Sequence, residues 1–262
     1  MAAARNQGET AMKLYGFVCG TLTAPMEGFA EGGAGAITVP VPAYYVEHPR
    51  GRVVIDTGMP PAMRDDPQTA IGRYLASVFK ADFTRGEDID RQLALIGVDA
   101  ASIDTVVNTH LHFDHCAGNH LLPNARIVIQ RPELEAARAA SPPKSGFDPM
   151  SELDGRDVQA IDGEHDLFGD GSVVLLPTYG HTPGHQSVKF ACDGGETVLM
   201  GDCCYFHRTL SDMVLPAFAH DAAEQRRSIA RLKTLADRGA RMIAGHDPDQ
   251  WPSREPVLLA GG

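Results

Sequence analysis

A run of six residues, HLHFDH at positions 110–115, constrains the fold of this chain more than any other feature of its sequence. It supplies four side chains of metal-binding type, and such a pattern arises by chance on the order of once per thousand chains of this length. The run directly follows the apolar segment 103–108, which has the character of a buried strand. The fold must therefore present this loop at a strand end, where neighbouring side chains can converge on one point.

Further histidine and aspartate residues follow other predicted strands: His181 in GHTPGH (180–185), Asp202 after Gly201, and His246 in GHD (245–247). Strand ends on one edge of a sheet are where ligands from distant positions gather. Imidazole and carboxylate donors suit zinc, and also iron, manganese or cobalt. Five histidines and two aspartates exceed the needs of one tetrahedral ion. The pattern thus predicts two divalent ions, zinc by preference, about 3.5–4 Å apart and sharing a carboxylate.

Short apolar strands alternate with helices around these motifs, which favours sheets covered by helices. The loop-rich stretch 141–171 is predicted to be an insertion that faces the substrate. The hydrophobic periodicity predicts strands at 13–18, 39–47, 52–55, 103–108, 126–130, 172–177, 186–192, 197–201 and 241–244. Helices are predicted at 68–79, 89–96, 132–140 and 221–237, the last with Asp221 as its N-cap.

Charge and cysteine content restrict the setting of the protein. The 262 residues suit one large domain, which we assign to residues 12–262 after a polar, disordered extension at 1–11. The net charge of −11 argues against nucleic acid and anionic membranes as partners. The five cysteines form no disulfide framework, and the sequence contains neither a signal-peptide core nor a membrane-spanning apolar run. We therefore expect a reduced, cytoplasmic protein.

The order of these motifs resembles that of the metallo-β-lactamase superfamily, over a stretch from about Lys13 to His246. The resemblance implies an α/β fold, the αββα sandwich, in which two sheets are flanked by helices. It also implies a ligand set in which one ion is held by His110, His112 and His181, the other by Asp114, His115 and His246, and both by a bridging Asp202.

Within that superfamily the chain most resembles the N-acyl homoserine lactone lactonases, which are quorum-quenching enzymes. The resemblance is carried by the segments 108–119 (NTHLHFDHCAGN), 178–187 (TYGHTPGHQS) and 244–247 (AGHD). Tyr179 stands where that family more often has proline. Tyr205 follows Asp202 by three residues, as in that family, and many other superfamily members lack it. A phenol at this place can donate a hydrogen bond to an oxyanion beside the metals.

The resemblance implies that the chain opens the ring of N-acyl homoserine lactones, which are small-molecule substrates. A hydroxide bridging the two ions would attack the lactone carbonyl, since metal binding lowers the pKa of water to about 7. Tyr205 would stabilise the oxyanion. Asp114, a ligand and proton carrier in that family, would protonate the leaving ring oxygen.

Other side chains around the motifs are candidates for supporting the metal site or binding the substrate. Asp56, in Asp-Thr-Gly at a strand end, is either a hydrogen-bonding partner behind a ligand histidine or a simple turn residue. His185 is predicted to make a structural hydrogen bond, because the superfamily pattern gives the ligand role to His181. An acyl chain needs an apolar groove. The candidates for its wall, each of them also a candidate for the core, are Met26, Phe29, Phe79, Phe83, Phe147 and Met150.

Several alternatives keep the metals and change the substrate to another lactone, such as a pyridoxolactone, a thioester of the glyoxalase II type, or a β-lactam. Phe113 and Tyr205 favour lactones. Di-iron redox members usually carry a glutamate within the metal motif, where this chain has Leu111 and Phe113. A non-catalytic metal-binding protein would not be expected to keep all seven ligand candidates. The oligomeric state stays open, with a homodimer as one option.

Overall fold

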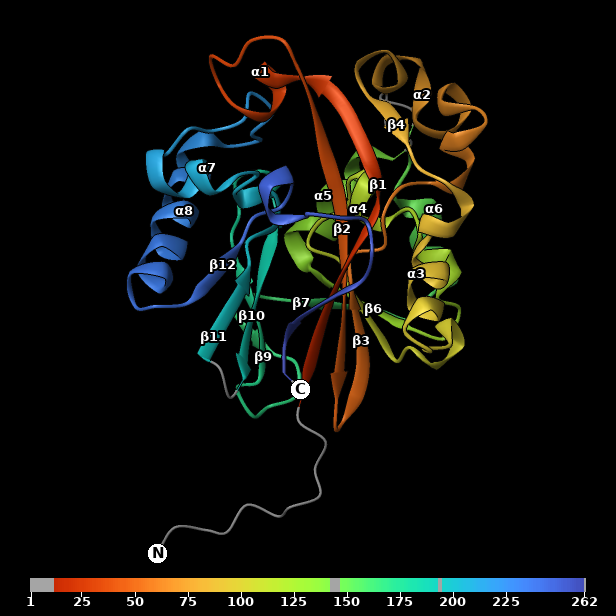
Figure 1. Ribbon diagram of the computed structural model, residues 1–262, viewed down its shortest axis with the longest axis vertical. Helices are drawn as coiled ribbons and strands as arrows, with labels where there is room; N and C mark the ends of the chain where they lie inside the picture. Colours follow the sequence, from red (N-terminus) through yellow and green to blue (C-terminus); the bar gives the residue numbers. More distant parts are fainter. Residues whose placement is uncertain (1–11, 142–146, 193–194, 262) are drawn as a thin grey trace, which may run out of the picture.

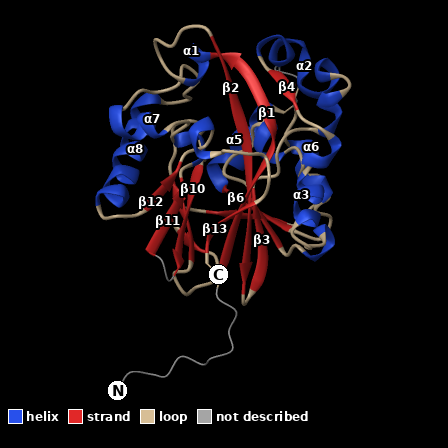
Figure 2. Cartoon of the chain, viewed as in Figure 1, coloured by secondary structure: helices blue, strands red, loops and turns tan. Residues whose placement is uncertain are grey.

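Two β-sheets pack face to face, and helices cover their outer faces (Figures 1 and 2). The structure is a computed structural model that describes residues 12–141, 147–192 and 195–261, so the extension predicted for residues 1–11 lies outside the described residues. Helices α7 and α8 lie on one side of the molecule, and α2, α3 and α6 on the other. The predicted αββα sandwich is confirmed.

The first sheet has eight strands in the order β13-β1-β2-β3-β5-β6-β7, with β4 paired to β1. Strands β3, β5, β6 and β7 run parallel, so the carboxyl ends of β3 and β5 lie at the same edge. That arrangement brings the residues after Ile55 next to those after Val107. The strands are β1 Lys13–Pro25, β2 Ala36–His48, β3 Gly51–Ile55, β4 Lys80–Asp82, β5 Thr105–Val107, β6 Arg126–Gln130, β7 Val158–Ile161 and β13 Val257–Ala260.

The second sheet has five strands in the order β12-β11-β10-β9-β8. Only β11 and β12 are parallel, and the other pairs are antiparallel. This topology puts the loop after β9 and the loops after β11 and β12 at one edge. The strands are β8 His165–Asp166, β9 Val173–Pro177, β10 Gln186–Cys192, β11 Gly195–Leu199 and β12 Arg241–Ile243.

The helices are mostly short, and α2, α3, α6, α7 and α8 lie on the two outer sides of the molecule. In the longest, the Asp221 side chain accepts hydrogen bonds from the backbone N–H groups of Ala223 and Glu224, which confirms the predicted N-cap. The helices are α1 Met26–Phe29, α2 Pro67–Val78, α3 Ile89–Leu95, α4 Phe113–Cys116, α5 Arg131–Ala140, α6 Met150–Leu153, α7 His207–Asp212 and α8 Ala222–Asp237.

The central strands are apolar on both faces because each face is covered. In β3, Val53 and Ile55 point into the core between the sheets, whereas Val54 points into the core beneath the helices. In β5, Val107 likewise points into the core between the sheets, and Val106 into the core beneath the helices. Side chains alternate along a strand, and parallel strands covered on both faces therefore read as continuous apolar runs. This double burial holds fixed the strand ends from which the polar loops leave.

Two sequence predictions need correction. Strand β1 extends to Pro25 instead of ending at residue 18, because a shift of register between Val18 and Thr21 lets it bend and continue, with Gly20 at φ 93°. The insertion predicted at 141–171 is wrong for most of its length. Strands β7 and β8 within it pair with β6 and β9, so this stretch completes both sheets instead of forming a substrate-facing loop.

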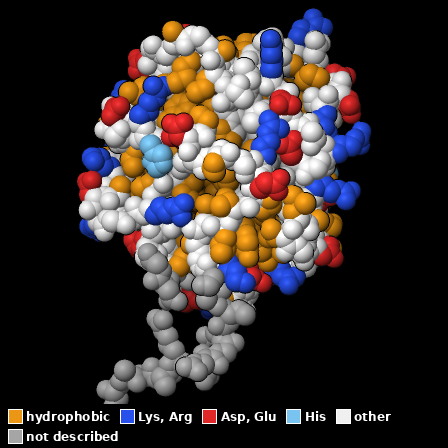
Figure 3. All heavy atoms as spheres, in the orientation of Figure 1, with side chains coloured by type: hydrophobic (Ala, Val, Ile, Leu, Met, Phe, Trp, Pro, Cys, Tyr) orange, Lys and Arg blue, Asp and Glu red, His pale blue; other side chains and the backbone are white. Residues whose placement is uncertain are grey.

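The outer surface carries charges of both signs. On the face seen in Figure 3, Lys and Arg side chains alternate with Asp and Glu, and apolar side chains show between them. Among the described residues, no helix combines the length and the apolar character needed to cross a membrane.

Candidate metal centre

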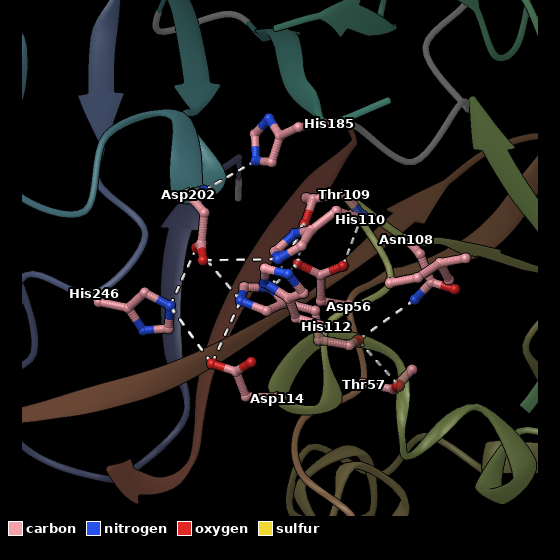
Figure 4. Close-up of polar contacts among 12 residues, drawn as sticks. Asp56, Thr57, Asn108, Thr109, His110, His112, Asp114, His185, Asp202 and His246 are labelled. Carbon is pink, nitrogen blue, oxygen red and sulfur yellow. Dashed lines mark hydrogen bonds and ion pairs between the residues drawn. The ribbon is translucent and has the colours of Figure 1, made fainter. Parts of the chain in front are cut away.

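Four loops from both sheets meet at one edge of the sandwich and carry all seven predicted ligands. The loop after β5 brings the 110–115 run, and the β9–β10 loop brings His181. The turn after β11 brings Asp202, and the loop after β12 brings His246. Figure 4 shows the side chains of Asp114, Asp202 and His246 turned toward the first loop, with Asp202 between His246 and the labelled histidines of that loop.

The seven residues fall into two groups. One contains His110, His112, His181 and Asp202, and the other contains Asp114, His115 and His246. Within each group the potential ligand atoms all lie within 4.8 Å of one another. The resemblance to the superfamily implies the same two sets of three, with Asp202 between them. We call the sets found here the first and second groups.

Asp202 lies between the two groups and turns one oxygen toward each. Its Oδ2 atom lies 3.3 Å from Nε2 of His181 and 3.7 Å from Nε2 of His110. Its Oδ1 atom lies 3.1 Å from Nε2 of His246 and 3.3 Å from Nε2 of His115. A carboxylate in this position can give one oxygen to each of two ions.

The remaining distances also suit metal ions. Nδ1 of His112 and Nε2 of His181 are 3.1 Å apart. Oδ2 of Asp114 is 3.6 Å from Nε2 of His115 and 3.8 Å from Nε2 of His246. A tetrahedral ion with bonds of about 2.0–2.1 Å holds its ligand atoms about 3.3–3.4 Å apart. The observed separations lie on both sides of that value.

Several of the atoms that could bind a metal are buried without a hydrogen-bond partner. Nε2 of His110, Nε2 of His115 and Oδ1 of Asp202 form no hydrogen bond with any described residue. Buried polar atoms nearly always have a partner, and exceptions call for an explanation. Their convergence on one another supplies one, because the residues fit a pair of divalent cations.

The outer nitrogens of two ligand histidines are held by acceptors. Nδ1 of His115 lies 2.8 Å from Oδ2 of Asp56, and Nδ1 of His246 lies 2.7 Å from the carbonyl oxygen of Pro40. Asp56 also accepts from the backbone N–H and the hydroxyl of Thr109, both at 2.7 Å. Ligating histidines usually donate their second N–H in this way, which leaves the other nitrogen free for the metal. Asp56 thus occupies the place of a partner behind a ligand.

His185 lies behind Asp202 and belongs to neither group. Its Nε2 accepts from the backbone N–H of Asp202 at 3.0 Å, and its Nδ1 lies 3.1 Å from the carbonyl oxygen of Thr178. Burial lowers the pKa of His185 to about 4, so the ring is neutral. Nε2 thus holds the backbone of Asp202, while Nδ1 anchors the ring to Thr178.

The charges of the centre favour a cation. Burial lowers the pKa of His110 well below its ordinary value. Burial acts in the same direction on His115, but Asp202, Asp114 and Asp56 outweigh it and raise the pKa of His115 well above its ordinary value. Burial would raise the pKa of Asp202, yet His115 and His246 hold it well below its ordinary value. The carboxylates therefore stabilise positive charge at this place.

Tyr205 closes one side of the centre. Its ring lies 5.6 Å from the ring of His181 and 5.3 Å from that of His246. Its carbonyl oxygen accepts from the N–H of His246 at 2.9 Å, which fixes the two loops side by side. Burial, followed by Asp202 and Asp114, raises the pKa of Tyr205 well above its ordinary value. The phenol thus keeps its proton at neutral pH and can donate it in a hydrogen bond.

With this geometry established, comparison with known proteins decides the family. The sequence profile described as the metallo-beta-lactamase superfamily matches residues 36–246. The chain belongs to this superfamily. That stretch contains all seven ligand candidates and Tyr205.

Several N-acyl homoserine lactonases are similar to this chain over most of its length. N-acyl homoserine lactonase AttM of Azorhizobium caulinodans is 30% identical over 254 residues, covering 93% of this chain and 96% of its own length. N-acyl homoserine lactonase AiiA of Bacillus thuringiensis subsp. kurstaki is 30% identical over 219 residues, covering 83% and 85%. A structure of an N-acyl homoserine lactone hydrolase, with the product N-hexanoyl-L-homoserine at its catalytic metal centre, superposes with TM-score 0.82 at 27% identity, covering 92% of this chain and 95% of that one.

Three of the six predicted wall residues lie beside the metal centre of this chain or pack against its metal loop. The ring of Phe29 lies 5.2 Å from that of Tyr205 and 6.2 Å from that of His246. Phe79 and Phe147 pack against Phe113 of the metal loop, with centroids 5.5 Å and 6.5 Å apart. Of the seven ligand candidates only His112 is exposed, so the centre is most open to solvent at that residue.

Of the other three predicted wall residues, Met26 and Phe83 belong to the same apolar cluster as Phe29, Phe113 and Tyr205, whereas Met150 packs against another cluster. Phe83 lies against Gly20, and the guanidinium of Arg64 stands over its ring at 4.6 Å. Met150 packs on the core beneath the helices. Met26 belongs to the apolar cluster around α1 and α2, and its sulfur lies 3.9 Å from a nitrogen of Arg208.

Sequence reasoning missed two residues that hold the ligand loops. The Gln225 side chain of α8 donates to the carbonyl oxygens of Asp202 at 3.2 Å and Cys203 at 3.1 Å. The Glu133 carboxylate of α5 accepts from two loop amides. Neither residue belongs to a motif. An acidic residue in the first turn of a helix, such as Glu133, is common because it interacts favourably with the helix dipole. No signal short of the tertiary structure marked them.

Proposed function

We propose that this protein is a dinuclear metal-dependent lactonase that hydrolyses N-acyl homoserine lactones. The observation that carries the proposal is Tyr205 packed beside a centre in which Asp202 turns one oxygen toward each group of ligands. A hydrogen-bond donor beside two cations suits the opening of an ester ring. The lactonase names of the relatives matched over most of the chain favour the same substrate class.

The donor set supports zinc as the metal of both groups. His110, His112 and His181 with Asp202 would hold one ion, and Asp114, His115 and His246 with Asp202 the other. Imidazole and carboxylate ligands without cysteine are typical of catalytic zinc. When bound, two such ions would polarise the lactone carbonyl and lower the pKa of a water molecule toward 7.

The residues of the chain supply hydrogen bonding and proton transfer. Ring opening adds a hydroxyl group to the carbonyl carbon, breaks the bond to the ring oxygen and places a proton on that oxygen. We assign the hydrogen bond to the carbonyl oxygen to Tyr205, whose phenol stays protonated. We assign delivery of the proton to Asp114, whose side chain is 12% exposed, compared with 3% for Asp202.

An acyl chain would lie along the aromatic side chains beside the centre. We propose Phe29 on the Tyr205 side and Phe79 and Phe147 on the Phe113 side as its wall. Apolar walls with few polar groups are typical of small-molecule sites. The weaker candidates Met26, Phe83 and Met150 would support this wall from behind.

A pH-stat assay tests the function directly. Protein loaded with two zinc equivalents is mixed with N-hexanoyl and N-decanoyl homoserine lactones near pH 7.5, where each ring opening releases one proton. Parallel assays use a pyridoxolactone, a glutathione thioester and a β-lactam. We expect turnover of the homoserine lactones at a kcat/KM above those of the other three. A higher kcat/KM for one of the other classes would refute N-acyl homoserine lactones as the preferred substrate. The proposed metal centre would not be affected by that result.

We also propose a cytoplasmic location. Cys19, Cys116, Cys203 and Cys204 are buried thiols that form no disulfide within the described residues, as expected in a reducing compartment. For the oligomeric state we keep a homodimer as a hypothesis, which sedimentation of the purified protein would test.

A further inference from the structure

Glu133 is a buried carboxylate that contacts two ligand loops without belonging to either. It lies in the first turn of α5 and is 5% exposed. One of its oxygens, Oε1, accepts from the backbone N–H of Leu111 at 3.0 Å. The other, Oε2, accepts from the backbone N–H of Gly184 at 2.9 Å.

The two amides come from loops of different sheets. Leu111 stands between His110 and His112 in the loop after β5 of the first sheet. Gly184 stands three residues after His181 in the β9–β10 loop of the second sheet. Across this junction Nδ1 of His112 and Nε2 of His181 lie 3.1 Å apart. A single side chain therefore ties together the loops that carry three donors of the first group.

The backbone around Glu133 leaves little freedom at this junction. A Cβ atom at Gly184 would lie 2.2 Å from the backbone nitrogen of Glu133 and 2.5 Å from its Cβ, so only glycine permits the approach. Leu111 is held on its other side, because its side chain is buried in the core beneath the helices. Both loops are thus fixed in position relative to the start of α5.

The hydrogen bonds of the Glu133 carboxylate go to these two backbone amides. Among the described residues no lysine, arginine or histidine forms an ion pair with Glu133. The first turn of a helix favours a carboxylate, and hydrogen bonds to an ionised acceptor are stronger than neutral ones. A carboxylate is also the side chain that can accept through two oxygens at once. A neutral amide of the same shape would turn an N–H group toward one of the two donors.

We propose that Glu133 is a positioning residue that sets the spacing of His112 and His181 and thereby the metal affinity of the first group. The proposal rests on the dinuclear centre of the proposed function. The second group depends on other contacts, since His115 is held by Asp56 and His246 by Pro40. Loss of Glu133 therefore weakens one of the two metal sites.

Metal titration tests this without any substrate. Metal-free wild type, Glu133→Gln and Glu135→Gln are titrated with Zn²⁺ in competition with a chromophoric chelator. Glu135 is the matched control, because it lies on the same helix and is exposed. We expect Glu133→Gln to weaken one of the two sites about 10- to 100-fold, as loss of a partner behind a ligand typically does. The other site, and both sites of Glu135→Gln, keep wild-type affinity.

A double-mutant cycle identifies the weakened site. In a His181→Ala background, where the first group already lacks a donor, Glu133→Gln is expected to cost no further zinc affinity. In a His246→Ala background it costs the same as in wild type. Wild-type affinity of Glu133→Gln at both sites would overturn the proposal. Equal weakening of both sites, together with a lower melting temperature of the metal-free protein, would assign Glu133 a general structural role instead.

A second variant covers the case in which Glu133→Gln does not fold. Glu133→Asp keeps the charge but is one methylene shorter, so it can reach only one of the two amides. We expect an intermediate loss of affinity at the same single site. If neither variant folds, amide exchange in metal-free wild type decides. Protection of the Leu111 and Gly184 N–H groups supports the contact, and rapid exchange of either contradicts it.

Discussion

Nδ1 of His246 lies 2.7 Å from the carbonyl oxygen of Pro40, although 206 positions separate the two residues. A carbonyl can only accept, so Nδ1 carries the proton and the free nitrogen of His246 faces Asp202 and Asp114. The pairing of β2 with β3 covers residues 44–48 of β2, so among the described residues that edge of β2 has no neighbouring strand at Pro40. A strand of the first sheet thereby orients a ligand that the second sheet supplies.

Asp202→Asn should disable the centre. Asparagine keeps the shape of the side chain but has one oxygen, so it cannot serve both groups. We expect bound zinc to fall from two equivalents to one or fewer, and kcat/KM to fall by more than the about 10- to 100-fold typical of partners behind ligands. Elemental analysis and the pH-stat assay measure these changes. Asp212→Asn, at an exposed position on α7, is the control. If Asp202→Asn bound two zinc equivalents and turned over normally, Asp202 would not be a bridging ligand.

Tyr205→Phe should slow the reaction and leave the metals in place. The phenol is the proposed donor to the carbonyl oxygen, and loss of one such donor typically lowers kcat about 10²- to 10³-fold. Tyr179→Phe is the matched control. It also removes a phenol hydroxyl, but that hydroxyl donates to Gln130 at 2.9 Å and has no proposed part in the reaction. Steady-state kinetics with zinc-loaded proteins measures both. Equal kcat for Tyr205→Phe and wild type would exclude the phenol from the mechanism.

Asp56→Asn should weaken zinc binding by the second group. Asp56 accepts from His115 and from two groups of Thr109, and an amide oxygen cannot replace both carboxylate oxygens. Its backbone has φ 55°, a left-handed conformation that asparagine adopts readily, so the turn itself is preserved. We expect about 10- to 100-fold weaker binding of one zinc ion by chelator competition. Unchanged affinity would show that His115 needs no carboxylate behind it.

Asp170 should stabilise the fold at neutral pH and lose that effect in acid. The hydroxyl of Ser172, followed by its backbone N–H and Arg50, lowers the pKa of Asp170 from 3.8 to about 2. A carboxyl with a depressed pKa in the folded state contributes stability above its unfolded pKa, and loses it as the pH falls through the folded value. The side chain is 39% exposed, so solvent screening limits the contribution to less than about 1 kcal/mol.

Urea unfolding of Asp170→Asn and wild type checks this pH dependence. The free energy of unfolding should be lower for the variant at pH 7, and the difference should shrink as the pH falls from 4 toward 2. Asp154→Asn, an exposed aspartate, serves as the control. A difference that stays constant from pH 7 to pH 2 would contradict the depressed pKa.

The local sequence was enough to predict that the seven ligand candidates lie at strand ends. The apolar runs before His110, Asp202 and His246 have the length and composition of buried strands, and the polar motifs begin where those runs end. Such signals depend on a few neighbouring residues and on the requirement that apolar side chains be buried. For the same reason the cap at Asp221 could be predicted from the residues of its own turn.

Only the tertiary structure decided how these loops are held. The contacts of Pro40 with His246, of Asp56 with His115 and of Glu133 with Leu111 join residues 22 to 206 positions apart. Each depends on which strands become neighbours, and an ordinary proline, turn aspartate or helix-terminal glutamate carries no mark of its partner. The strands within 141–171 escaped prediction likewise, because β7 and β8 are short and are stabilised by pairing with strands that the local sequence does not name.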